Sequence, residues 1–290
     1  MKFSDLSINS STFFGFFSKV IDEPPNLTTI LTTIKIFFLM FFMDMLFLGP
    51  AGSGKTSLVK YFSEWIRSTQ NKSVSCINLD PGVDCLPYEA DFDIRKFFTI
   101  ESIMKEEELG PNGALVRAIE KTVEMEDEIR PEIEKVKADF RLIDLPGQLE
   151  PFLFHSGEKI INYFDVKRML GIFLIPAEMF NLKGLAVSEL LSLIVRLKLG
   201  IPTINVLSKI DLSKNIEEIE NFLKSPRKLR KALEKIEGGI EKDLAILASR
   251  LVEKIVKEQR IVKTSAKTGE GMNDLYDVCY EVFCSCGDLR

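Results

Sequence analysis

The sequence has one histidine and one tryptophan, and it has no excess of positive charge. A net charge of −5 without a basic stripe argues against direct nucleic-acid binding. The five cysteines are an odd number without framework spacing, which is typical of a reducing compartment. We therefore expect a cytoplasmic protein and not a disulfide-rich secreted one.

Metal-ligating residues are equally scarce. Three cysteines gather near the carboxyl end, at Cys279, Cys284 and Cys286, while His155 lies far away in sequence. A metal site there would need further ligands. Two interpretations stay open, a metal site or ordinary helix-face and tail cysteines, and the second is favoured.

Long hydrophobic runs are also missing. The run Ile36–Met43 is too short to span a bilayer, so a membrane role is not expected. Residues 1–42 nevertheless hold nine of the 22 phenylalanines, and two prolines at 24–25 break any continuous element. The interpretations are a mis-assigned start with translation from Met43 or Met45, a genuine apolar or disordered extension, or membrane attachment. We expect the first.

The chain is organised around Gly49–Thr56, which follows the apolar run Met43–Leu48. It fits the pattern Gly, four residues, Gly-Lys-Ser/Thr between a strand signal and a helix signal. Glycines let backbone N–H groups face a β-phosphate, Lys55 would bridge the β- and γ-phosphates, and Thr56 would bind Mg²⁺. The positive end of the helix dipole also faces the anion. The predicted phosphate-binding residues are Gly49, Pro50, Ala51, Gly52, Ser53, Gly54, Lys55, Thr56 and Ser57.

Strand and helix signals alternate over residues 43–290, which we take as one domain. Short apolar strands joined by helices predict an α/β fold with a doubly wound, mainly parallel sheet, here of the P-loop NTPase type. Charged helical insertions are expected at about residues 100–137 and 213–258. The predicted strands are Met45–Leu48, Val74–Leu79, Phe140–Ile143, Leu170–Ile175, Thr203–Leu207 and Arg260–Lys263.

Polar residues follow the predicted strand Phe140–Ile143. Asp144 at a strand end can hold the Mg²⁺ shell, usually through water. Gly147 lets a backbone N–H approach the γ-phosphate, so the loop can sense that group. Gln148 would orient the attacking water.

Two later strand ends predict recognition of a guanine base. Asp211 can accept two hydrogen bonds from guanine, and an unpaired carboxylate would disfavour adenine. The stem of Lys209 would lie along the base plane. Ser208 stands where many GTPases carry Asn, so one side-chain contact is expected to be weaker or absent. A backbone N–H within Ser265, Ala266 and Lys267 would meet the guanine O6.

These motifs in this order resemble a GTPase. Gly110, Pro111 and Asn112, between the second and third predicted strands, resemble the GPN-loop GTPases, although Gly110–Gly113 would also suit an ordinary helix–helix turn. Asn78–Pro81 and Asp91–Arg95 are similar to that family's switch segment. The resemblance covers residues 43 to about 283 and fits the archaeal branch, since the eukaryotic C-terminal tail is absent.

The resemblance implies a homodimer that binds GTP or GDP with Mg²⁺ and hydrolyses GTP as a nucleotide switch. Asn112 would approach the γ-phosphate region of the other subunit, and Asp80 would position water or Mg²⁺ with Thr56 and Asp144. Asp80, Gln148 and Asn112 are thus the catalytic candidates, although an Asp before Pro also makes an ordinary turn.

Two other functions fit parts of the sequence. One is a slow-turnover assembly factor or chaperone, with a protein client such as an RNA polymerase-type assembly. The other is a small-molecule kinase, which would want an Arg-bearing lid that the acidic 100–137 insertion does not resemble.

Overall fold

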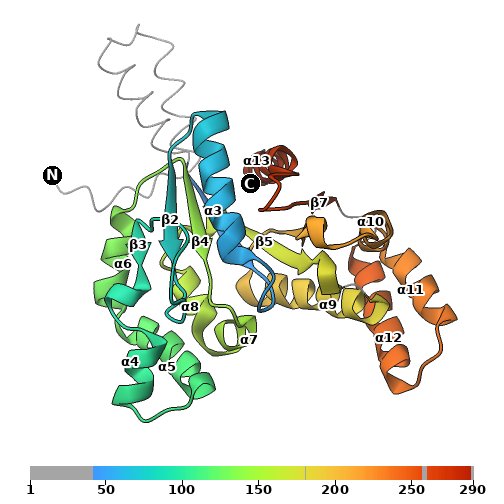
Figure 1. Ribbon diagram of the computed structural model, residues 1–290, viewed down its shortest axis with the longest axis horizontal. Coiled ribbons are helices and arrows are strands. Elements are labelled where there is room, and N and C mark those ends of the chain that lie inside the picture. Colours follow the sequence, from blue (N-terminus) through green and yellow to red (C-terminus); the bar gives the residue numbers. More distant parts are fainter. Residues whose placement is uncertain (1–41, 180, 257–259, 289–290) are drawn as a thin grey trace, which may run out of the picture. The chain divides into compact units, whose positions relative to one another are not determined.

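The computed structural model describes residues 42–179, 181–256 and 260–288, with the side chains of Met179 and of residues 283–288 left aside (Figure 1). The chain divides into two compact units, residues 1–41 and 42–290. The first unit, and with it the expectation of a start at Met43 or Met45, lies outside the described residues. So do the side chains of Cys284 and Cys286, whereas Cys279 is buried.

A single seven-stranded sheet runs through the described part of the chain. Its strand order is β3-β2-β4-β1-β5-β6-β7, and every neighbouring pair is parallel. The doubly wound α/β prediction is confirmed, and β3 is a strand that the sequence did not predict. The strands are β1 (Met43–Leu48), β2 (Val74–Asn78), β3 (Phe92–Asp93), β4 (Phe140–Asp144), β5 (Met169–Pro176), β6 (Thr203–Ser208) and β7 (Ile261–Lys263).

Helices cover both faces of the sheet, which is why its strands are almost wholly apolar. In β1, Met45 and Phe47 face one core with α3 and α13, while Leu46 and Leu48 face a second core that includes α5 and α9. The longer helices are α3 (Lys55–Trp65), α4 (Ile100–Glu106), α5 (Pro111–Glu124), α6 (Glu126–Lys135), α9 (Leu182–Leu199), α10 (Ile216–Lys224), α11 (Pro226–Lys235), α12 (Ile240–Ile255) and α13 (Met272–Asp288). The short helices α7 (Leu149–Pro151) and α8 (Gly157–Ile161) follow β4.

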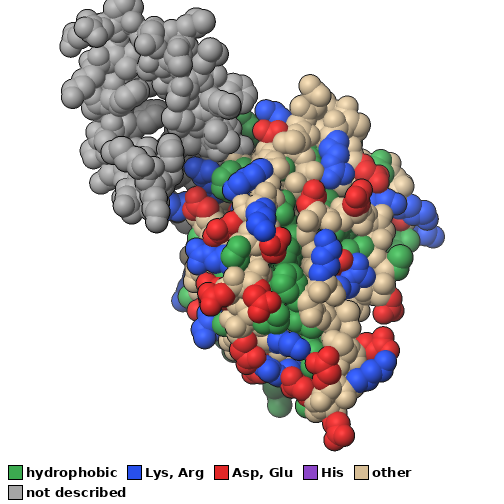
Figure 2. Space-filling model, turned by 90° about the vertical axis from the view of Figure 1, so that its left-hand side faces the viewer, with side chains coloured by type: hydrophobic (Ala, Val, Ile, Leu, Met, Phe, Trp, Pro, Cys, Tyr) green, Lys and Arg blue, Asp and Glu red, His purple; other side chains and the backbone are tan. Residues whose placement is uncertain are grey.

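The two charged blocks are occupied by α4 to α6 and by α10 to α12. Acidic and basic side chains alternate over the face of the molecule shown in Figure 2. Arg117 on α5 pairs with Glu107 at 3.0 Å and with Glu124 at 2.8 Å. Such partly exposed ion pairs add little stability. Because charges of both signs are mixed over the face in Figure 2, it has no field of a single sign.

A buried ion pair joins β1 and β4 near the amino-terminal ends of these two strands. The Arg141 guanidinium on β4 donates to both carboxylate oxygens of Asp44 on β1 at 2.6 Å. Burial raises the pKa of Asp44 even though Arg141 opposes the shift. The same guanidinium lies 4.8 Å from the ring centre of Phe42 and 5.4 Å from that of Phe164. The folded unit therefore includes Phe42, one residue before the predicted boundary.

Among the described residues, no helix is both long and apolar enough to cross a membrane.

Candidate functional site

The phosphate-loop stretch leaves the carboxyl end of β1 and enters α3. Three of its glycines have left-handed φ angles, 144° at Gly49, 73° at Gly52 and 91° at Gly54. At Gly49 a Cβ atom would also lie 2.7 Å from the Leu174 carbonyl oxygen, so only glycine fits. The strand therefore turns sharply, and the loop closes around the amino end of α3.

Lys55 lies buried at the first position of α3. Its Nζ donates to the carbonyl oxygens of Gly49 at 2.9 Å, Pro50 at 3.2 Å and Gly147 at 3.1 Å. Burial lowers the pKa of Lys55, while the carboxylates of Asp144 and Asp80 oppose the shift. The ammonium thus joins the loop after β1 to the loop after β4, two segments that the sequence assigned to one site.

Asp144 ends β4 and is buried beside Thr56 and Tyr88. The Tyr88 hydroxyl donates to Asp144 Oδ2 at 3.0 Å. Burial raises the pKa of Asp144 to about 6, against the lowering effect of hydrogen bonds from Thr56 and Tyr88. Its Oδ1 has no hydrogen-bond partner within the described part of the chain. A buried carboxylate oxygen left unpaired beside a threonine hydroxyl fits the oxygen ligands that Mg²⁺ prefers.

Asp80 makes a turn and also contacts the loop after β4. Its Oδ1 accepts from the Gly82 backbone N–H at 2.9 Å, and its Oδ2 accepts from the Gly147 N–H at 3.1 Å. The sequence analysis leaves open whether Asp80 makes an ordinary turn or acts in the site. The Gly82 contact makes a turn, and the Gly147 contact places Asp80 against the loop after β4; its role in the site stays a prediction. Gln148 follows Gly147 but is exposed. No described residue forms a hydrogen bond with its side chain in this arrangement.

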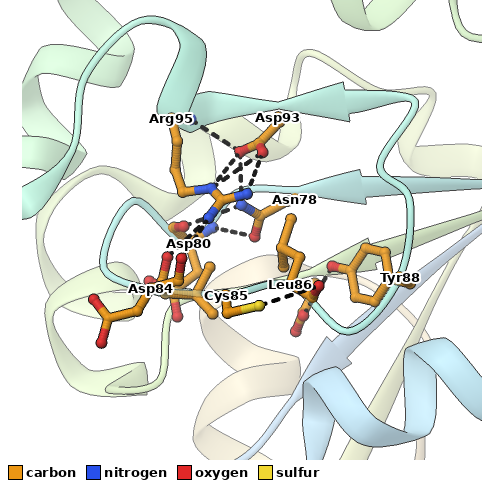
Figure 3. A network of polar contacts seen from close by, with 10 residues as sticks. Asn78, Asp80, Asp84, Cys85, Leu86, Tyr88, Asp93 and Arg95 are labelled. Carbon is orange, nitrogen blue, oxygen red and sulfur yellow. Dashed lines mark hydrogen bonds and ion pairs between the residues drawn. The ribbon is translucent and has the colours of Figure 1, made fainter.

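A polar network behind Asp80 fixes this loop (Figure 3). Asn78 at the end of β2 accepts from the Asp80 N–H at 3.0 Å and donates to Asp93 Oδ1 at 2.9 Å. Asp93 binds the Arg95 guanidinium, with the closest contact at 2.6 Å. Arg95 in turn donates to the carbonyl oxygens of Val83 at 3.0 Å and Asp84 at 3.2 Å. The network closes a ring from β2 through β3 to the loop that carries Asp80.

The second half of the site is a pocket of about 230 Å³ next to the phosphate loop. Asp211 Oδ1 accepts from the Ser265 hydroxyl at 2.6 Å. The Ser265 oxygen also accepts from the backbone N–H groups of Lys267 and Thr268, each at 3.2 Å. Residues from three strand ends line the pocket: Ser53, Gly54, Ser57, Leu58, Ser208, Lys209, Asp211, Leu212, Thr264, Ala266 and Lys267.

Ser208 lies at the end of β6, next to the phosphate loop. Its hydroxyl donates to the Ser53 carbonyl oxygen at 2.8 Å and is buried. This bond joins β6 to the phosphate loop, and whether the contact made by Asn in many GTPases is weaker here stays a prediction. Lys209 has a left-handed φ of 56°, and its Nζ pairs with Glu178 at 2.5 Å. Its stem passes within 4 Å of where a Gly54 side chain would begin.

Gly110, Pro111 and Asn112 form a helix start, whereas the sequence predicted a loop between two helices. Gly110 is the residue before α5, Pro111 is the first residue of that helix and Asn112 the second. Glycine before a helix and proline at its first position are both favoured, since proline lacks an N–H that would be unpaired there. Asn112 is exposed, and the structure does not bring it into contact with the residues of its own site described above.

Two residues of this region were missed by sequence reasoning. Tyr88 lies in an irregular loop whose pattern carries no periodicity, so nothing in the sequence connects it with Asp144. Thr268 directly follows the predicted base loop, and a serine hydroxyl accepting from backbone N–H groups two or three residues later is a common local motif. From that motif the hydrogen bond between the Thr268 N–H and the Ser265 hydroxyl oxygen could have been predicted.

The architecture by itself defines a class of protein. A central parallel strand leads through a glycine loop ending in Gly-Lys-Thr into a helix, and acidic residues follow the adjacent strands. This is a P-loop nucleotide-binding α/β protein.

The comparisons agree with this class. Residues 47–285 match the family described as conserved hypothetical ATP binding protein. A GPN-loop GTPase from Pyrococcus abyssi is 34% identical over 253 residues, which is 85% of this chain and 100% of that protein. The chain belongs to the GPN-loop GTPase family.

A solved structure and a plant relative extend the comparison. The crystal structure of a Pyrococcus abyssi GTPase in apo form superposes with a TM-score of 0.74 at 33% identity, over 84% of this chain and 98% of that one. A GPN-loop GTPase of Arabidopsis thaliana is 37% identical over 174 residues, 57% of each chain. For that relative the match spans little more than half its length.

Proposed function

We propose that the protein hydrolyses GTP to GDP and phosphate with Mg²⁺, acting as a homodimeric nucleotide switch. The observation that carries the proposal is one pocket lined both by Asp211, which accepts from the Ser265 hydroxyl, and by the phosphate-loop residues Ser53 and Gly54. A base placed there meets a carboxylate acceptor, and the attached phosphates reach the amino end of α3. The names of the relatives support GTP as the nucleotide.

The phosphate side follows from the same geometry. Lys55 exchanges its three carbonyl partners for phosphate oxygens, since a charged acceptor is the stronger one. Thr56, Asp144 and Asp80 are the oxygen ligands available to Mg²⁺, directly or through water. When bound there, the metal ion would neutralise charge that develops on the phosphates.

The Gly147 N–H supplies the switch. It donates to Asp80 in this structure, and it is the N–H that we expect to approach the γ-phosphate. Asp80 and the γ-phosphate are therefore competing acceptors for one donor. Transfer of this hydrogen bond to the γ-phosphate releases the Asp80 carboxylate to orient water or a metal ligand, with Gln148 on the exposed side to position the nucleophile.

Asn112 of the partner subunit completes the site in this proposal. The start of α5 is exposed, and Gly110 offers no side chain to cap it. The N–H groups of Asn112 and Gly113 have no acceptor within the helix, as is general for the first turn. They suit the approach of a negatively charged group from another molecule.

Binding calorimetry and phosphate release test the function. We expect GTP to bind at least about tenfold more tightly than ATP, because adenine leaves the Asp211 carboxylate unpaired. Phosphate release should require Mg²⁺. Equal affinity for GTP and ATP contradicts the base assignment, and absence of phosphate release from bound GTP contradicts the enzyme assignment.

A further inference from the structure

The loop between β2 and β3, residues 79–91, carries Asp80 near its start and Tyr88 near its end (Figure 3). Each of these residues contacts the segment that follows β4. The Asp80 carboxylate accepts from the Gly147 N–H at 3.1 Å, and the Tyr88 hydroxyl donates to Asp144 Oδ2 at 3.0 Å. Only Asp80 has a part in the function proposed above, so the contact made by Tyr88 needs its own explanation.

The position of Tyr88 is fixed by its ring and by its backbone. The ring is partly buried and packs against the core that lies under α3 and α13. Three residues later, Asp91 binds the loop to β2. The Asp91 N–H donates to the Cys76 carbonyl oxygen, and the Asp91 carboxylate accepts from the Cys76 N–H, both at 2.8 Å. The hydroxyl therefore meets Asp144 from a place that packing defines.

The two carboxylate oxygens of Asp144 have different surroundings. The residue is 1% exposed, Oδ2 accepts from Tyr88, and Oδ1 has no hydrogen-bond partner among the residues that the structure describes. The torsion that turns an aspartate carboxylate has a broad distribution, so the side chain alone does not decide which oxygen faces a ligand. A donor held on Oδ2 makes that choice and leaves Oδ1 as the free acceptor.

Tyr88 can keep this contact when the site is occupied. A tyrosine hydroxyl retains its proton at neutral pH and remains a donor. The other polar groups near Asp144 have different tasks, since Lys55 Nζ donates to three carbonyl oxygens and the Thr56 hydroxyl is itself a candidate ligand of Mg²⁺. Tyr88 is thus the neighbour that can hold the carboxylate without competing for the phosphates or the metal ion.

We propose that Tyr88 is a positioning residue for Mg²⁺ binding. By donating to Asp144 Oδ2, its hydroxyl keeps Oδ1 available to the metal ion or to one of its water ligands. The inference rests on the proposed function, because it assumes a Mg²⁺ site at Thr56 and Asp144. Loss of a hydrogen bond that orients a metal ligand typically lowers metal affinity by about ten- to a hundredfold.

Tyr88→Phe keeps the ring and removes the hydroxyl. Release of a fluorescent GDP analogue at increasing Mg²⁺ concentration gives the concentration at which retention is half-maximal, and release in EDTA reports nucleotide binding without metal. We expect the half-saturating Mg²⁺ concentration to rise at least about tenfold, while the release rate in EDTA stays that of the natural chain. In the background of Asp144→Asn, the same change should have no further effect, since the hydroxyl acts through that carboxylate.

Tyr280→Phe, at an exposed position on α13, is the matched control and should leave both values unchanged. Thermal unfolding checks that each variant is folded. An unchanged or lower half-saturating Mg²⁺ concentration in Tyr88→Phe overturns the inference, and so does an equal acceleration of release with and without Mg²⁺. These outcomes leave the GTPase proposal intact. GDP release from the natural chain that does not depend on Mg²⁺ contradicts the proposed Mg²⁺ site itself, and the inference fails with it.

Discussion

At the scale of single residues, Asp211 leads to a specific prediction about which nucleotide binds. Its carboxylate is fixed by the Ser265 hydroxyl at 2.6 Å, so it presents its remaining acceptor sites in one orientation. Asp211→Asn should weaken GTP binding at least about tenfold, since an amide cannot accept both guanine N–H groups. It should strengthen binding of xanthosine triphosphate, whose carbonyl replaces the exocyclic amine.

Calorimetry with the two nucleotides measures this exchange. Asp127→Asn on α6 is a matched control, since Asp127 is an exposed aspartate outside the site. A variant that keeps natural GTP affinity would remove Asp211 from base recognition.

Because the Glu189 carboxyl group on α9 is buried, we expect the stability of the fold to depend on pH. It is 1% exposed, and burial raises its pKa from the usual 4.5 to about 8. A carboxyl whose folded pKa is raised binds its proton more firmly when folded, so its contribution to stability falls as pH rises from 4.5 to 8. Glu189→Gln should therefore raise the free energy of unfolding by about 3 kcal/mol more at pH 8 than at pH 5.

Urea unfolding at both pH values measures that difference. Any change in packing that the amide causes alters the free energy of unfolding equally at both pH values, so it cancels in the difference. The control Glu217→Gln, at an exposed position on α10, should change the free energy of unfolding by the same amount at pH 5 and pH 8. An equal effect of Glu189→Gln at pH 5 and pH 8 would contradict the raised pKa.

At the scale of elements, Arg95 connects β3 to the loop that carries Asp80. Two nitrogens of its guanidinium donate to the Asp93 carboxylate, and the third donates to the backbone carbonyl oxygens of Val83 and Asp84. The single ammonium group of a lysine cannot make all of these hydrogen bonds. Arg95→Lys should cost about 1–2 kcal/mol of stability. It should lower kcat more than it raises KM for GTP, because Asp80 acts after binding.

Steady-state kinetics and thermal unfolding together test this role. Arg130→Lys on α6 is the matched control, since Arg130 also binds two carboxylates but lies on the exposed surface. A loss of stability with unchanged kcat would make the Arg95 network structural only.

The strands and helices also show which structural features can be predicted from the sequence. Strands such as β1 and β5 were predicted because their apolar runs are bounded by glycine, proline or charge. β3 was missed because Phe92–Asp93 is too short to show any period. For the start of α5 the sequence analysis expects a loop between two helices, with an ordinary turn as the alternative, although glycine followed by proline is also a helix-start signal. The Arg95 contacts to Val83 and Asp84 are tertiary, and no spacing in the chain encodes them.

At the scale of the whole molecule, the proposed homodimer makes a prediction about mixed subunits. Asn112→Ala should lower GTP hydrolysis with little loss of affinity, and Lys55→Ala should weaken nucleotide binding. If Asn112 acts on the other subunit's site, a heterodimer of the two variants has one intact site and one with both changes. An equimolar mixture should then recover about a quarter of the natural activity, as random pairing of subunits requires.

Phosphate release from the mixture is the measurement, and native mass spectrometry confirms that subunits have exchanged. Each variant assayed alone is the control. Activity equal to the mean of the separate variants, with heterodimers present, would place Asn112 in its own subunit's site or outside both.

The sheet itself affects how the protein behaves in concentrated solution. Its two edges are β3 with two residues and β7 with three. Unpaired N–H and C=O groups along an edge strand are a template for aggregation, and a short edge offers few of them. Aggregation by strand pairing is thus disfavoured while the fold is intact. We expect aggregation during storage to begin only after molecules unfold, and not through pairing of the edge strands of native molecules.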